Sequence, residues 1–141
     1  MTVNGPDAVD LLHLEDADGD RCVVRVTEPA GEGMLRAEVL VHADFVDARL
    51  ELFLSPAELD AWRRELDGID LGRAFGLGGE RGVSLGLQPH QDGYLVVTVE
   101  DPERLSMVLW IRPPAGWTDE HRGRLEQVRR AWPGEVAPAA P

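Results

Sequence analysis

The sequence predicts an α+β fold in which antiparallel sheets of about seven strands combine with two helices, in the order ββββ-α-βββ-α. Residues 34–54 alternate between apolar and polar side chains, the pattern of antiparallel strands with one buried and one wet face. Ser55, Pro56 and Glu58 then form a helix start signal. Strands and helices do not alternate one by one, so a Rossmann-type parallel sheet is not expected.

The first four strands fill residues 9–54. Segments 9–15 and 21–28 flank a turn at 16–20, where aspartates and a glycine favour a hairpin connection. A Pro/Gly loop separates them from two longer strands within 34–54. The inward phase of these two strands consists of Leu35, Ala37, Val39, Val41, Ala43, Val46, Ala48, Leu50, Leu52 and Leu54.

The first helix is predicted over about 56–67, with Ser55 as the N-cap. Gly68 is expected to end it, since glycine favours helix C-termini. Its apolar stripe is Leu59, Trp62, Leu66 and Ile69. We expect Leu59, Trp62 and Leu66 to be buried against Val39, Leu50 and Leu52.

The second helix is predicted over about 118–131, starting at Thr118. Acidic residues at its beginning and Arg129 and Arg130 at its end suit the helix dipole. Its apolar stripe is Leu125, Val128 and Trp132.

Between the helices, the glycine-rich residues 70–82 are expected to be mainly loop. Strand patterns resume at 83–88, 94–100 and 104–112, and Asp92–Gly93 predicts a hairpin turn between the first two. We predict one domain over residues 1–132 and a disordered Pro/Ala-rich tail over 133–141.

Three apolar side chains fall on the outer, otherwise polar phase of their strands: Leu40, Phe53 and Trp110. We expect the second helix to cover them. If it does not, they form an exposed apolar patch and a candidate contact surface.

Charge and cysteine content restrict the function. The net charge is −12, and residues 1–60 alone hold 14 acidic and 4 basic side chains. A nucleic-acid backbone or an anionic membrane would be repelled, whereas a basic protein partner is compatible with this charge.

The single cysteine, Cys22, cannot form an intramolecular disulfide, and the N-terminus lacks the pattern of a secretory signal, so we predict a cytoplasmic protein.

No motif predicts a cofactor, a metal or a catalytic centre. The 16–20 turn lacks the glycine and glutamate positions of an EF-hand, and residues 76–82 do not match a phosphate-binding loop. The four histidines have no metal-ligand spacing. Ser84 lacks the glycine that precedes a nucleophile elbow, and Cys22 alternates with valines as a core residue does.

The candidate binding site is the outer face of the 34–54 hairpin. Its residues are Glu38, Leu40, Asp47, Glu51 and Phe53. An acidic rim around an apolar centre is suited to a basic protein partner, because the rim speeds encounter and the centre slows dissociation. The best hypothesis is therefore a non-catalytic protein-binding module. The alternative is a small hydrolase or metal-dependent enzyme whose site forms only in the fold, and a cleft lined by histidine and carboxylates would favour it.

Three stretches resemble an uncharacterised family of small actinobacterial proteins. They are LEDADGDRCVVRV (14–26), LVHADFVDARLELFLSPAELDAWRRELD (40–67) and LWIRPPAGWTDEHRGRLEQVRRAWP (109–133). The resemblance covers nearly the whole chain and implies no activity. The layout is also similar to that of WapI-like immunity proteins of bacterial toxin systems, which implies a toxin-neutralising role without catalysis.

Overall fold

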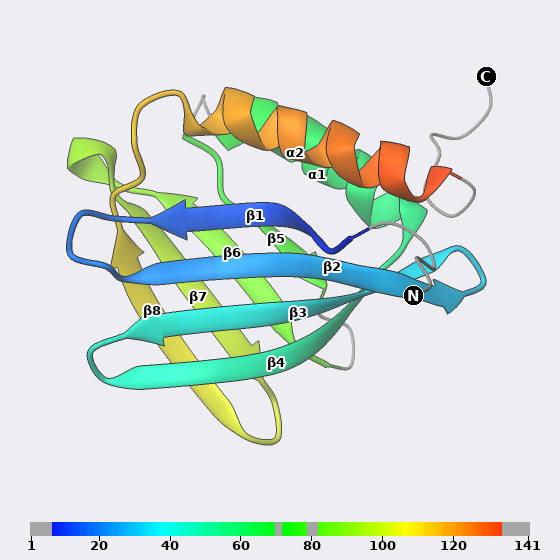
Figure 1. Cartoon of the computed structure of the whole chain (residues 1–141). Helices are drawn as coiled ribbons and strands as arrows, with labels where there is room; N and C mark the ends of the chain where they lie inside the picture. Colours follow the sequence, from blue (N-terminus) through cyan, green and yellow to red (C-terminus); the bar gives the residue numbers. More distant parts are fainter. Residues whose placement is uncertain (1–6, 70–71, 79–81, 134–141) are drawn as a thin grey trace.

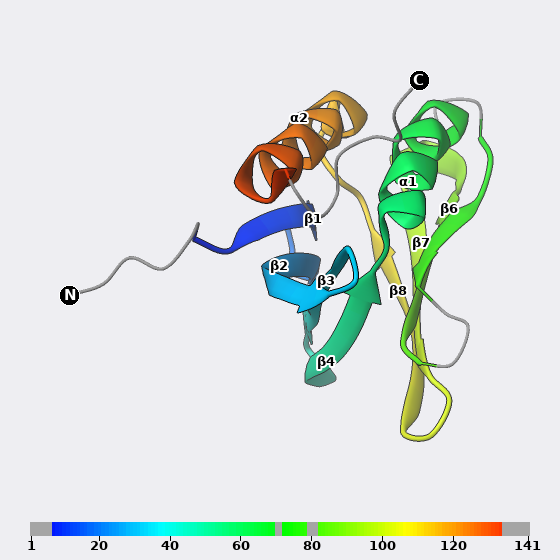
Figure 2. The same ribbon diagram turned by 90° about the vertical axis from the view of Figure 1, so that its right-hand side faces the viewer.

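Two four-stranded antiparallel sheets pack face to face, and two helices lie side by side along one open side of the sandwich (Figures 1 and 2). The computed structural model describes residues 7–69, 72–78 and 82–133. Sheet A consists of β1 (Val9–Glu15), β2 (Arg21–Gly31), β3 (Met34–Ala43) and β4 (Val46–Leu54), in that spatial order. Sheet B consists of β5 (Phe75–Gly78), β6 (Ser84–Pro89), β7 (Leu95–Asp101) and β8 (Leu105–Ile111). The helices are α1 (Pro56–Ile69) and α2 (Trp117–Ala131), and a short 3-10 turn covers Gln91–Gly93.

The predicted α+β class and element order are confirmed, with one strand more than expected. The additional strand, β5, lies in the glycine-rich stretch that was expected to be mainly loop, with no more than a short extended piece. It alternates buried Phe75 and Leu77 with exposed glycines, but over only four residues, which is too short for a clear pattern. A Cβ at Gly76 would come within 2.9 Å of the Leu85 carbonyl oxygen, so the glycine permits close approach of β5 to β6.

The core lies between the inner faces of the two sheets and extends under the helices. All six residues predicted to pack together there, Leu59, Trp62, Leu66, Val39, Leu50 and Leu52, are buried in this core. The Trp62 ring lies 4.6 Å from the Phe75 ring, which ties α1 to sheet B. Cys22 is fully buried, as its alternation with valines predicted.

Local signals positioned α1 and the hairpin turn well. The Ser55 hydroxyl oxygen accepts a hydrogen bond from the Glu58 N–H at 3.1 Å, as an N-cap does. Asp92 and Gly93 both have positive φ, as the tight turn between β6 and β7 requires. Gly68, however, does not end α1, which continues to the buried Ile69. The chain turns instead where the Gly72 N–H donates to the Ile69 carbonyl, with Gly72 at φ +84°.

Helix α2 differs from the prediction in its start and in its position. It begins at Trp117 after Gly116, whose φ is +82°, while Thr118 is buried. Instead of covering sheet outer faces, α2 packs on β1 and α1 (Figure 2). Phe53 and Trp110 therefore remain 40% and 49% exposed, and the prediction that α2 covers them was wrong.

Two further sequence predictions concern the ends of the chain and the membrane. The predicted division into a domain of residues 1–132 and a tail of 133–141 stays a prediction, because residues 1–6 and 134–141 lie outside the described residues. Among the residues described, neither helix has the length and apolar character that crossing a bilayer requires.

Candidate functional site

The five residues predicted to bind a partner all lie on the outer face of sheet A, but they do not form one acidic patch. Glu38 and Glu51 face each other across β3 and β4, whereas Asp47 lies opposite His42 near the far end of the hairpin. Leu40 is half-buried beside Arg49. Phe53 lies at the other end, where the Arg36 guanidinium sits 5.8 Å from its ring centroid.

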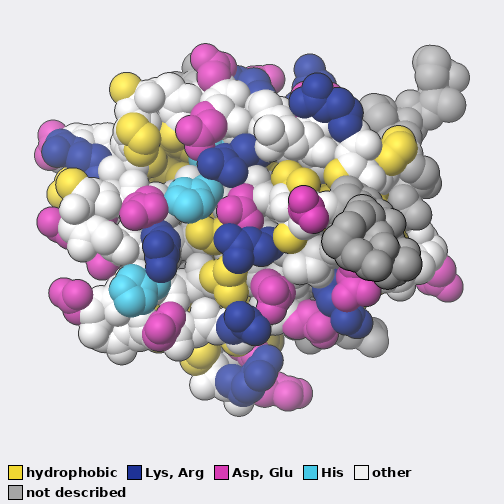
Figure 3. Space-filling view, in the orientation of Figure 1, with side chains coloured by type: hydrophobic (Ala, Val, Ile, Leu, Met, Phe, Trp, Pro, Cys, Tyr) yellow, Lys and Arg dark blue, Asp and Glu magenta, His cyan; other side chains and the backbone are white. Residues whose placement is uncertain are grey.

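Ion pairs within the molecule occupy most of these carboxylates. Glu38 Oε2 lies 3.3 Å from Arg49 Nε, and Glu51 Oε2 lies 3.3 Å from Arg36 Nε. These pairs offset the repulsion between the two directly opposed glutamates. The outer face of sheet A is consequently a mosaic of both charges, as Figure 3 shows.

A hollow of about 420 Å³ on this face contains two histidines and three arginines. Its lining is His13, Arg21, Val23, Arg25, Leu40, Val41, His42, Asp47, Ala48 and Arg49. In Figure 3, histidine and arginine side chains surround apolar ones here. The lining holds no serine, threonine or cysteine. Carboxylates pair with two basic side chains of this lining: Glu15 lies 3.0 Å from His13 Nε2, and Asp10 lies 2.8 Å from Arg25 Nε. The hollow thus places His13 and His42 in one lining with Asp47.

A larger cleft, of about 570 Å³, lies beside Phe53 and carries an excess of acid. It is lined by Glu51, Leu52, Phe53, Glu58, Gly78, Gly82, Val83, Asp101, Pro102, Glu103 and Arg104. Four of these side chains are carboxylates and one is an arginine, and no histidine is present. The cleft thus includes two of the predicted site residues, Glu51 and Phe53, and brings them next to the turn between β7 and β8. No local pattern indicated that Glu51 and Asp101, which are 50 residues apart, would line the same cleft.

Hydrogen bonds hold two of the carboxylates of the cleft, Asp101 and Glu58, in place. The Glu103 N–H and the Arg104 guanidinium donate to Asp101 at 3.1 and 2.6 Å, and these bonds hold the pKa of Asp101 below its usual value despite partial desolvation. Glu58 Oε2 accepts a bond from the Gly78 N–H. Within the described part of the chain, Glu103 forms no ion pair and extends the negative rim.

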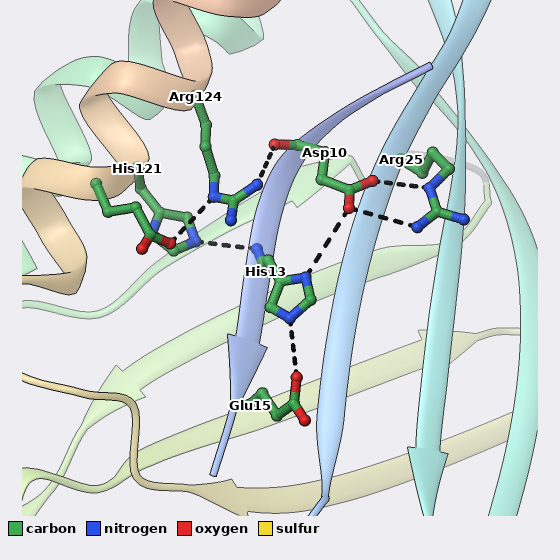
Figure 4. A network of polar contacts seen from close by, with 7 residues as sticks. Asp10, His13, Glu15, Arg25, His121 and Arg124 are labelled. Atoms are coloured by element: carbon green, nitrogen blue, oxygen red, sulfur yellow. Dashed lines mark hydrogen bonds and ion pairs between the residues drawn. The ribbon is translucent and has the colours of Figure 1, made fainter. Parts of the chain in front are cut away.

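A buried histidine joins α2 to β1, and sequence reasoning missed it (Figure 4). His121 is 1% exposed. Its Nε2 accepts a hydrogen bond from the His13 N–H at 3.0 Å, and its Nδ1 donates to the Trp117 carbonyl at 2.6 Å. Since the carbonyl can only accept and the amide can only donate, this geometry fixes the neutral tautomer. Arg124 continues the contact by donating to the Asp10 carbonyl at 3.2 Å.

Burial lowers the pKa of His121, and the bond to Trp117 opposes this shift only partly. Both ring nitrogens are occupied by the backbone, so neither is available to a substrate. A lowered pKa is often a sign of function, but here it results from burial of the ring in the fold.

The nucleophile and metal predictions can be compared with the residues described. Burial raises the pKa of the Cys22 thiol to about 12, which keeps it protonated and unreactive. Across residues 7–69, 72–78 and 82–133, no three His, Cys, Asp or Glu side chains gather in a way that could hold a metal ion. The 16–20 segment is a turn in which Asp16 Oδ1 accepts from the Asp18 N–H at 2.9 Å. Part of the 76–82 segment, residues 79–81, lies outside the described residues.

A second apolar surface lies on the outer face of sheet B. Val108 and Trp110 on β8 are 51% and 49% exposed. The rings of His90 and Tyr94 lie 4.6 and 6.2 Å from the Trp110 ring and flank it. The sequence indicated this surface because Trp110 falls on the outward-facing side of the predicted strand 104–112.

Comparisons with known proteins place the chain in a family without assigning an activity. No curated protein and no solved structure matches it. One family model matches residues 9–133, which is most of the chain and includes all eight strands and both helices. The chain therefore belongs to the family of unknown function DUF5959.

Proposed function

We propose that this protein is a non-catalytic protein-binding module that receives a basic segment of a partner in the acidic cleft beside Phe53. The observation that carries the proposal is the combination of an exposed aromatic ring and four carboxylates around one cleft. The aromatic wall supplies apolar contact, and the carboxylates attract and orient a cation. An arginine side chain of the partner fits both, because its planar guanidinium stacks on rings and pairs with carboxylates.

The remaining predicted residues fit this proposal as the approach to the cleft. Glu38 and Asp47 lie farther along the hairpin, where Glu38 pairs with Arg49 and Asp47 lies against His42. Their contribution would be to the long-range field of a chain with net charge −12, which raises association rates with basic partners. An immunity role, in which the partner is a basic toxin, would use the same surface.

A test is to titrate the full chain with a short arginine-rich peptide while following backbone amide shifts by NMR. The proposal expects the largest shifts at residues 51–53 and 101–104, and weaker binding as salt is raised. Glu51→Arg and Glu103→Arg should each weaken binding about tenfold, the equivalent of about 1.4 kcal/mol. Phe53→Ala should weaken binding without changing its salt dependence.

Asp44→Arg is the matched control, because it changes the net charge equally but lies in the turn at the other end of the hairpin. It should leave the affinity nearly unchanged. If Asp44→Arg weakens binding as much as Glu103→Arg, the peptide senses only the total charge and the cleft is not the site.

A further inference from the structure

The two sheets have four edge strands, and three of them are protected against pairing with another strand. α2 covers β1, and its His121 and Arg124 bond the free amide of His13 and the free carbonyl of Asp10. β4 carries outward Asp47, Arg49 and Glu51. β5 is only four residues long and lies against α1 and β4. Covering, charge and shortness are the usual ways in which proteins blunt sheet edges.

The fourth edge strand, β8, has none of these protections. Its sequence, LSMVLWI, contains no charged residue, proline or glycine. Its seven residues pair with β7 in continuous register without a bulge. Within the described residues, β8 bonds through its backbone to β7 alone. Its outward side chains Val108 and Trp110 are about half exposed. The free backbone groups of β8 can be satisfied by water or by another β-strand.

We propose that β8 pairs with β8 of a second copy of this chain, antiparallel about a two-fold axis, so that two B sheets become one continuous sheet. A strand edge of this kind is self-complementary, because a two-fold axis normal to the sheet keeps the outward phase of both copies on the same face. Trp110 and Val108 of each copy then lie beside those of the other.

The lack of charge on this edge is compatible with a second copy there. Each chain carries a net charge of −12, so two copies repel at long range, but contact between uncharged segments adds no like-charge pair at short range. β8 provides seven consecutive uncharged residues. The His90 and Tyr94 rings contact the Trp110 ring, which restricts this side chain and lowers the entropy lost when it becomes buried. A single added strand pair buries less than the area of about 1,200 Å² typical of stable complexes, so the dimer is weak and depends on concentration.

The test is sedimentation of the full chain over a range of concentrations, in low salt and in about 0.5 M salt, where screening shortens the repulsion to a few ångströms. The expected mass rises with concentration from 15.5 kDa towards twice that value, and salt strengthens the association. Salt has the opposite effect on the basic-partner binding proposed above, so the two proposals succeed or fail separately. Amide exchange in β8 should slow as the concentration rises, while exchange in β4 should not.

Val108→Lys should weaken the dimer at least tenfold, because it places a charge on the paired edge. Its control is Thr98→Lys, since Thr98 lies directly opposite Val108 on the inner strand β7 and on the same face. Thr98→Lys should leave the dimer intact. A chain that stays monomeric at the highest concentration in high salt overturns the proposal. So does a dimer that both substitutions abolish or that leaves β8 amide exchange unchanged, since either result indicates contact through the face instead of the edge.

Discussion

Strands β1 and β8 each form one edge of a four-stranded sheet, but only β1 has neighbours along its free side. At β1, the α2 side chains His121 and Arg124 bond an amide and a carbonyl that a further strand would otherwise bond. At β8, no described residue does so. The two edges also differ in their outward side chains, since β1 exposes Asp10, His13 and Glu15 in a polar network and β8 exposes Val108 and Trp110 (Figure 4).

This difference shows that a sheet edge can be closed by side chains from a distant helix instead of by a strand. Closing β1 in this way requires a neutral, buried histidine at a fixed position, which links the stability of α2 to the protonation of one ring. Leaving β8 open requires nothing from the rest of the fold, and it keeps an apolar edge available to a partner.

The largest expected loss of stability comes from a substitution in the core that lies beneath His121 and the edge of β1. Trp62 is 1% exposed and lies 4.6 Å from Phe75 and 6.5 Å from His121, measured between ring centroids. Trp62→Ala should lower the free energy of unfolding by about 3–5 kcal/mol, as large aromatic deletions in cores do. Trp110→Ala on the bare edge is the control, and it should cost far less because the indole is half exposed. Denaturant unfolding of both variants measures the contrast, and equal losses would contradict the core assignment.

Removing the histidine cap should have the next largest effect. His121→Leu fills a similar volume but leaves the His13 N–H and the Trp117 carbonyl without their partner. A buried group left unpaired costs about 1–3 kcal/mol, so a loss of that order is expected. The exchange of the His13 amide should also become faster. His42→Leu is the control, because His42 is exposed on the same sheet and should change the stability little.

Acid should loosen the β1 edge in the native protein. Burial lowers the folded-state pKa of His121 below its ordinary value of 6.5, so the folded state binds fewer protons than the unfolded chain. The contribution of His121 to stability is therefore complete above pH 6.5 and is lost as the pH falls through that value to the folded pKa. Denaturant unfolding from pH 7.5 to 5 should show a decline that is smaller in His121→Leu. An identical pH dependence in both proteins would show that other groups cause it.

Local patterns predicted most of the elements because each pattern reports on its own segment. Period-2 alternation located β3 and β4, and the Ser55–Pro56 signal located the start of α1. β5 was not predicted as a strand of its own because it has only four residues, two of them glycines, and Gly76 is what allows it to lie close to β6. The order of the elements along the chain and the inward side of each strand could be predicted from the sequence. Which helix or sheet packs on each sheet depends on contacts between distant segments, and local patterns do not indicate it.

The sites could be predicted only in part, for the same reason. Glu51 and Phe53 were identified from strand phase, but their cleft needs Asp101 and Glu103 from the other sheet. Arg129 was placed at the end of the second helix for its charge, and it lies in the last turn of α2, but its burial and its ion pair with Asp60 of α1 were not predicted. Such pairs join residues far apart in sequence, and no local period indicates them.

The smallest expected effect concerns Arg124, the second α2 side chain that bonds the backbone of β1 beside His121. Arg124 donates to the Asp10 carbonyl at 3.2 Å, and its Nε lies 3.1 Å from Glu120. Arg124→Met keeps much of the apolar stem but removes the donor, and one such bond contributes about 0.5–1.5 kcal/mol. Arg63→Met is the matched control, because Arg63 is an exposed helical arginine paired with Glu126 across the two helices, and exposed pairs of this kind contribute little. Denaturant unfolding should rank His121→Leu first, Arg124→Met second and Arg63→Met last. If Arg63→Met costs as much as Arg124→Met, the bond to Asp10 adds nothing beyond an ordinary surface ion pair, and His121 alone closes the edge of β1.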